Sequence, residues 1–193
     1  MGYTSYVLGV KIYRDRSNRV LDLSQEMYLK KILEKFKMHN SISISTLVEK
    51  NHHVNLEDCL HTPELQQMTH IPYSNVIRCL MNVMLCTRLD ISFSVRLMSH
   101  FQSNPYLYHW SIVKRVLKYR RGITHYVLCY GGLDLRLHGY TNENYAGDMD
   151  KRKSTFAYTF LLGGGAISWC SKKQSVMALL IMDAEYITVP AAT

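Results

Sequence analysis

The spacing of hydrophobic residues changes about two thirds of the way along this 193-residue chain. Up to Gly122, apolar residues recur mostly every three or four positions, which is typical of helices that bury one face. After Gly122 they alternate with polar residues, which is typical of strands that bury one face of a sheet. The pattern therefore predicts an α+β protein in which a helical region precedes a sheet.

A β-hairpin and one helix are predicted at the start of the chain. Residues 6–13 are rich in strand-forming side chains, residues 14–18 supply turn chemistry, and residues 20–23 return as a second strand. Ser24 suits the N-cap of a helix that extends to Phe36 and carries lysines on its outer face. These lysines have the ordinary interpretation of a solvated surface.

Three more helices are predicted after a polar linker that covers residues 39–71. They span about residues 72–85, 90–101 and 109–121. Pro72 suits the first turn of the first of them. In the last helix the apolar stripe reaches position 120, where Arg120 stands instead. Either the stem of this arginine extends to the surface, or the packing around it is damaged.

The part after Gly122 predicts a sheet. The strands cover residues 126–130, 133–139, 155–161 and 166–169, with a strand also near residues 140–144. Glycines at 131–132 and 163–165 supply turns. A helical stripe over residues 178–189 would cover the sheet before Pro190 ends it. A sheet with one covering helix is an incomplete domain, so we expect a truncated sequence.

Composition indicates a folded protein with an acidic partner. Hydrophobic residues make up 47% of the chain, which is enough for a core, and the net charge is +8. Nucleic acid is the first partner to consider, because phosphates attract dispersed lysines and arginines. The five cysteines form no CxxC pair, and the histidines around Cys59 lack the spacing of a zinc site. Without a secretion signal or membrane-length apolar run, we expect an intracellular protein with free thiols.

Candidate chemistry concentrates in residues 139–189, where acidic residues, a basic run, a triple glycine and a helical pattern follow one another. A strand near residues 140–144 and a helix carrying Glu185 could bring carboxylates together, as two-metal nucleases require. The strand offers Asn142, however, and an amide oxygen brings no charge to Mg²⁺. The glycines at 163–165 precede neither GK[ST] nor a helix, so they predict a hairpin turn rather than a phosphate loop.

Four segments resemble the C-terminal part of the Pol polyprotein of copia-type LTR retrotransposons, as found in plant genomes. They read YVLGVKIYRDRSNRVLDLSQEMYLKKILEKFKM, IPYSNVIRCLMNVMLCTRLDISFSVRLMSHFQSNPYLYHW, VKRVLKYRRGITHYVLCYGG and GYTNENYAGDMDKRKSTFAYTFLLGGGAISWCSKKQSVMALLIMDAEYITV. The resemblance implies that residues 1–38 are the tail of the reverse-transcriptase palm. It makes residues 72–125 a helical thumb or connection region. Residues 126–193 would begin a truncated RNase H-like domain with a mixed sheet and one covering helix.

The resemblance also implies which catalytic positions survive. The polymerase motif of the YVDD type lies upstream of the family segment that begins this chain. The RNase H-like part normally begins GYSDADWAGD, which puts Asn142 at the first metal-ligand position and Glu185 of the AEY motif at the second. The later ligands would lie beyond Thr193. We therefore expect no enzymatic activity and no bound cofactor, although the intact family uses Mg²⁺, and Asn142→Asp alone should not restore cleavage.

Two departures from the family pattern fit relaxed selection. Leu89 replaces the usual proline of CTRPDI, and Arg120 replaces the usual leucine of KYLRG. Both changes fall in the helical region rather than in the stretch with candidate chemistry. They support the expectation of a degenerate, pseudogene-like fragment of a transposable element.

Two other functions stay open. The chain could be a residual module that binds an RNA:DNA hybrid through its phosphates, as the family's substrate implies. The cations concerned are Lys114, Lys118, Arg121, Lys151, Arg152, Lys153, Lys172 and Lys173. It could instead be a domesticated protein that binds another protein. A truncated sheet with an uncovered edge should aggregate. Stable expression and cooperative unfolding would therefore favour this alternative. In the intact family, the remainder of the Pol polyprotein is a further partner.

Overall fold

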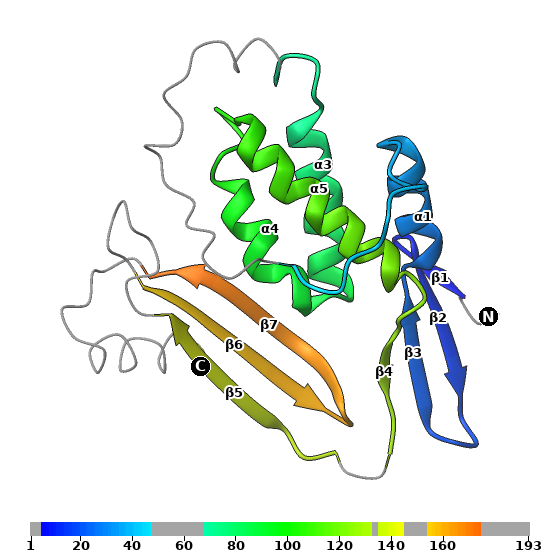
Figure 1. The fold of residues 1–193 in the computed structure, drawn as a ribbon. Coiled ribbons are helices and arrows are strands. Elements are labelled where there is room, and N and C mark those ends of the chain that lie inside the picture. Colours follow the sequence, from blue (N-terminus) through cyan, green and yellow to red (C-terminus); the bar gives the residue numbers. More distant parts are fainter. Residues whose placement is uncertain (1–4, 48–67, 133–134, 145–153, 175–193) are drawn as a thin grey trace. The chain divides into compact units, whose positions relative to one another are not determined.

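The computed structural model describes residues 5–47, 68–132, 135–144 and 154–174. These residues belong to two compact units, of which the first extends to Cys129 and the second begins at Tyr130. The first unit contains the helices, and the second contains an antiparallel sheet of its own (Figure 1). The predicted α+β class is therefore confirmed. No helix in the described ranges is long and apolar enough to span a membrane.

A small four-stranded sheet in the order β1-β2-β3-β4 lies almost entirely in the first unit, and its pairs β1–β2 and β2–β3 are antiparallel. Its strands are Tyr6–Val7, Val10–Asp15, Val20–Ser24 and Leu128–Tyr130. The predicted hairpin is confirmed for β2 and β3, and the Asp15 carboxylate fixes its turn by accepting bonds from the backbone N–H groups of Ser17 and Asn18. A single strand over residues 6–13 is wrong. Leu8 and Gly9 have φ values of 50° and 81° and turn the chain between β1 and β2.

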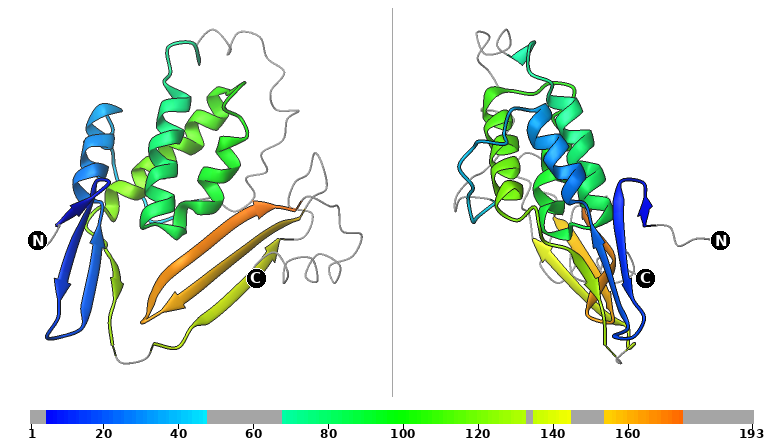
Figure 2. Two further views of the ribbon diagram at one scale, coloured as in Figure 1. Left: turned by 180° about the vertical axis from the view of Figure 1, so that it is seen from behind. Right: turned by 90° about the vertical axis from the view of Figure 1, so that its right-hand side faces the viewer.

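Four helices and one short 3-10 turn make up most of the remaining described residues of the first unit. They are α1 (Glu26–Lys35), α3 (Tyr73–Cys86), η2 (Leu89–Ile91), α4 (Ser92–Ser99) and α5 (Leu107–Gly122). The four helices predicted before Gly122 are confirmed. Figure 2 shows α1 beside the group of α3, α4 and α5, and α1 contacts both α3 and α5. The core draws on each helix, with Leu29, Ile77, Leu80, Ile91, Val95 and Val116 all nearly inaccessible to solvent.

Arg120 lies inside this core, with none of its side chain exposed. Extension of its stem to the surface, one of two possibilities from the sequence, is therefore wrong. Its Nη1 atom lies 3.9 Å from Oδ2 of Asp90, and its three side-chain nitrogens make no hydrogen bond within the described residues. Burial, followed by the nearby charge of Arg88, lowers the pKa of Arg120 to about 10. The guanidinium still carries its charge at neutral pH.

Asp90 is the acid that faces this buried cation. Arg88 donates two hydrogen bonds to its carboxylate, at 3.0 and 2.6 Å, and the hydroxyl of Tyr119 donates a third at 3.0 Å. Burial acts to raise the pKa of Asp90, but the hydrogen bond and charge of Arg88, with the charge of Arg120, hold this pKa below its usual value. One carboxylate therefore serves as counter-ion to two guanidiniums.

The second unit is a three-stranded sheet in the order β5-β6-β7, formed by His138–Asn144, Thr155–Leu162 and Gly165–Lys173. The glycine turn is confirmed, because Gly163 and Gly164 have φ values of 56° and 77° between the paired residues Leu162 and Gly165. Two left-handed residues match the turn that joins twisted antiparallel strands.

Other details of this sheet differ from the predictions. The strand predicted over residues 133–139 is wrong for residues 135–137, which lie outside any strand, because β5 begins only at His138. All described pairs in the sheet are antiparallel, so these strands do not show the expected mixed sheet. The expected covering helix, over residues 178–189, falls outside the described residues, as do the histidines and the cysteine of the linker.

Candidate nucleic-acid interface

Helix α5 carries a row of cations on the side opposite its buried stripe. Val113, Val116 and Leu117 are buried against the rest of the first unit. Lys114 is exposed and Lys118 is half-buried, and because they are four residues apart they lie on the same side of the helix. Within the described residues neither lysine has an ion-pair partner. No acid within the described residues therefore neutralises either ammonium group.

Arg121 continues this row but also has a structural role. Its Nη1 donates a hydrogen bond to the backbone carbonyl of Ser41, in the segment that follows α1. On the same helix, Nε of Arg115 donates to the carbonyl of Leu47 at 3.2 Å, and its Nη2 donates to Oγ1 of Thr46 at 2.9 Å. The sequence gives no sign of these contacts, because their partners are separated by 68 to 80 positions.

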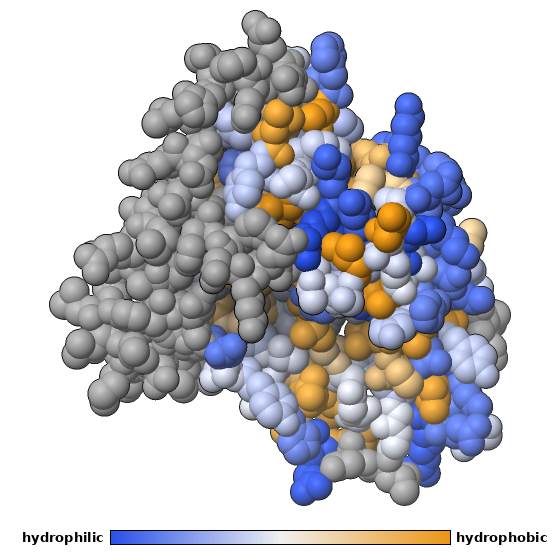
Figure 3. All heavy atoms as spheres, in the orientation of Figure 1, coloured by the Kyte–Doolittle hydropathy of each residue, from blue (hydrophilic) through white to orange (hydrophobic). Residues whose placement is uncertain are grey.

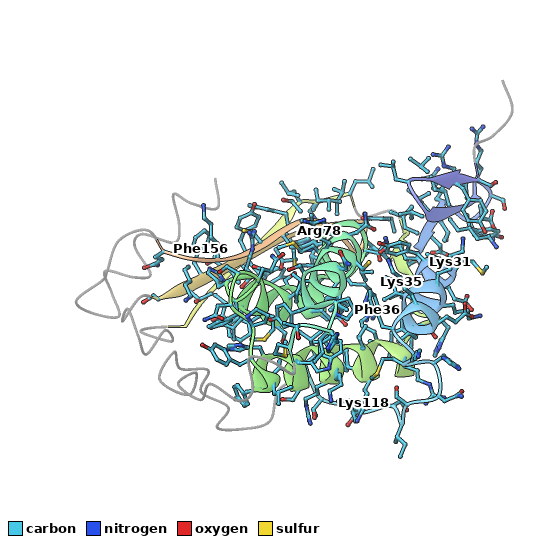
Figure 4. The ribbon with its side chains drawn as sticks, turned by 90° about the horizontal axis from the view of Figure 1, so that it is seen from above. Lys31, Lys35, Phe36, Arg78, Lys118 and Phe156 are labelled. Carbon is cyan, nitrogen blue, oxygen red and sulfur yellow. The ribbon has the colours of Figure 1, made fainter. Side chains whose placement is uncertain are left out.

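Helix α1 also carries exposed cations, for which the sequence predicts an ordinary solvated surface. Lys31 and Lys35 are exposed on α1, and Lys118 lies on the neighbouring helix α5 (Figure 4). Hydrophilic side chains cover the outer side of α1, at the right of Figure 3. Lys30 differs from the others, because its ammonium lies 2.7 Å from the carboxylate of Glu26.

The cations predicted in the second unit are only partly described. Lys172 and Lys173 are neighbours on β7, so their side chains leave opposite faces of the sheet and do not form one patch. Lys172 is exposed, and Lys173 is half-buried and makes other interactions. Lys151, Arg152 and Lys153 lie outside the described residues. The interface is therefore best defined on α5.

Of the two nuclease-like positions, only Asn142 lies within the described residues. Asn142 lies on β5, pairs with Ala157 of β6 and is exposed, whereas Glu185 is outside the described ranges. No group of three or more His, Cys, Asp or Glu side chains in those ranges could hold a metal ion. A pair of Mg²⁺ ions requires several charged oxygen ligands. The neutral amide of Asn142 does not fit that requirement.

Comparison with known proteins identifies the family. The chain is 44% identical over 188 residues to the "Retrovirus-related Pol polyprotein from transposon TNT 1-94" of Nicotiana tabacum. It is 31% identical over 185 residues to the corresponding polyprotein from transposon RE2 of Arabidopsis thaliana. The chain belongs to the copia-type retrotransposon Pol polyproteins. These two alignments cover 97% and 95% of the chain but 14% and 12% of the polyproteins, so the chain spans a small part of their length.

A shorter relative also aligns with this copia-type Pol segment. The "Secreted RxLR effector protein 161" of Plasmopara viticola is 38% identical over 127 residues, which is 65% of the chain and 89% of that protein. No family model and no solved structure matches the chain. The RNase H-like identity expected for the second unit therefore rests on its sequence motifs.

Proposed function

We propose that this copia-type Pol segment binds the phosphate backbone of nucleic acid through α5 and does not cleave it. The observation that carries the proposal is the pair Lys114 and Lys118, which lie on one side of a helix whose other side is packed into the core. A packed helix holds its cations at a fixed spacing, so less conformational entropy is lost on binding.

Binding of this kind depends on the charge and spacing of the backbone phosphates and not on the base sequence. Each phosphate that a lysine neutralises releases condensed counterions, so the affinity falls as the salt concentration rises. The net charge of +8 favours association with any polyanion at long range. The family's RNA:DNA hybrid is the substrate class that we propose for the site, and both strands of a hybrid present phosphates to such a row.

The absence of cleavage is proposed from Asn142. This residue stands where the family pattern has the first aspartate ligand of Mg²⁺, and its amide supplies no negative charge. We expect that the full chain incubated with Mg²⁺ leaves a labelled hybrid at full length. Mg²⁺-dependent shortening of the RNA strand that Glu185→Gln abolishes would contradict this part of the proposal.

A pair of charge variants tests the binding site. In gel-shift titrations with an RNA:DNA hybrid, Lys114→Gln combined with Lys118→Gln should lower the affinity about tenfold or more, because two phosphate contacts are lost. The matched control combines Lys11→Gln with Lys30→Gln. It removes the same charge from β2 and from the Glu26-paired lysine of α1. Equal losses of affinity in both double variants would show that only net charge matters and would overturn the assignment to α5.

A further inference from the structure

We infer that residues 39–47, here called the strap, restrain the binding surface of α5 and are displaced when nucleic acid binds. This inference rests on the proposed function and adds a regulatory element to the same site. The strap follows α1 and reaches α5 through the two arginine contacts described above. Apart from the buried Arg120, α5 carries four cations in this region, which are Lys114, Arg115, Lys118 and Arg121. The strap therefore competes with phosphate for the two arginines among them.

The strap atoms that accept hydrogen bonds from these two arginines are neutral. Arg121 donates to the carbonyl of Ser41, and Arg115 donates to the carbonyl of Leu47 and the hydroxyl of Thr46. A guanidinium bonds more strongly to a phosphate, because the charge of the acceptor adds to each hydrogen bond and two parallel bonds can form. Phosphate can therefore replace the strap at both arginines.

The strap has few contacts that would resist displacement. Met38, just before it, is buried and accepts a hydrogen bond from Ser41 at 2.7 Å, so the strap is anchored at its start. Beyond that point most of its residues are exposed, and Ile42 exposes 83% of its surface. Segments with little buried apolar surface open at a small free-energy cost compared with global unfolding.

One close approach shows how the strap can be controlled without changing a cation. Gly122, the last residue of α5, lies so near the strap that a Cβ atom added there would be 3.2 Å from Cβ of Ser43. Disulfides join Cβ atoms about 3.5–4.5 Å apart, so a small shift would bring two cysteines into bonding range. A large side chain at position 122 would instead push the strap away from α5.

The test uses a reversible lock in the full chain. Ser43→Cys combined with Gly122→Cys is oxidised to close the strap, the new bond is verified by mass spectrometry, and dithiothreitol reopens it. Hybrid binding is measured across a range of salt concentrations in both states. The closed form should bind about tenfold more weakly, and its slope of log K against log salt should be shallower by about 1.8, because two arginine contacts are withheld. Reduction should restore both values.

Three controls keep the outcomes distinct. The native chain, which has five cysteines, and each single-cysteine variant receive the same oxidation and should not change. Gly122→Leu, which displaces the strap sterically, should bind at least as tightly as the native chain. If the closed and open forms bind equally, or if Gly122→Leu weakens binding while the protein stays folded, the strap is not a restraint although the proposed function stands. If no form binds the hybrid, the proposed function itself fails.

Discussion

Arg120 is a charged side chain buried completely in the core of the first unit. The apolar period of α5 requires a hydrophobic side chain at this position, and the structure places a charged one there without hydrogen bonds inside the described residues. The period predicted the problem correctly. It could not show that Asp90, thirty positions away, shares its charge between Arg88 and Arg120.

Replacing this arginine should stabilise the first unit. A pKa lowered to about 10, chiefly by burial, means that the charge of Arg120 costs the folded state free energy at neutral pH. Arg120→Leu removes that cost, so the free energy of unfolding in urea should rise by about 2–3 kcal/mol. The control Arg78→Leu removes an exposed charge from α3 and should change it by less than about 0.5 kcal/mol. A destabilised Arg120→Leu variant would contradict this account.

Asp90, which faces Arg120, should make the free energy of unfolding depend on pH. Because the pKa of Asp90 is lower in the folded state than the ordinary 3.8, its charged form contributes stability at pH values above the ordinary pKa. That contribution should disappear as the pH falls through the lower, folded-state pKa. Asp90→Asn should lose it at every pH, so its unfolding free energy should fall less steeply below pH 4 than that of the native chain. Parallel acid limbs for the two proteins would contradict the prediction.

At the scale of elements, long and periodic segments were predictable and short turns were only partly so. The apolar repeats of α3, α4 and α5 were sufficient to locate them. The glycines at 163 and 164 predicted a hairpin turn, and both have the positive φ that glycine adopts readily. The turn at Leu8 and Gly9 was missed, since leucine rarely adopts the left-handed region and gives no turn signal. The position of the strap could not be predicted either, because Arg115 and Arg121, which bind it, are far from it in the sequence.

The turn between β6 and β7 should require glycine at position 164 because of its backbone conformation. A Cβ atom at Gly164 would meet nothing within 4 Å, so its φ of 77° alone decides which residues are tolerated. Gly164→Val should lower the stability of the second unit by about 1–2 kcal/mol, whereas Gly164→Asn should cost clearly less. Fluorescence of Trp169 on β7 reports the unfolding of this sheet once Trp110 of α5 is replaced by phenylalanine. Equal effects of valine and asparagine would show that the backbone conformation is not the cause.

At the scale of the whole molecule, the sequence predicted the family and the order of helical and sheet regions. The candidate site was predictable only in part. Lys114 and Lys118 were identified from the polar stripe of α5, while the second role of Arg121 and the added lysines of α1 depend on packing between elements. Asn142 was recognised from the family motif, and its place on β5 agrees with the strand expected there.

The salt dependence of binding shows whether α5 holds nucleic acid by its phosphates. The full chain is titrated with a labelled RNA:DNA hybrid by filter binding between low and moderate salt. Contacts from Lys114 and Lys118 alone predict a slope of log K against log salt of about −1.8, which approaches about −3.6 when Arg115 and Arg121 also reach phosphates. An affinity that does not change over this range would contradict binding through the phosphate backbone.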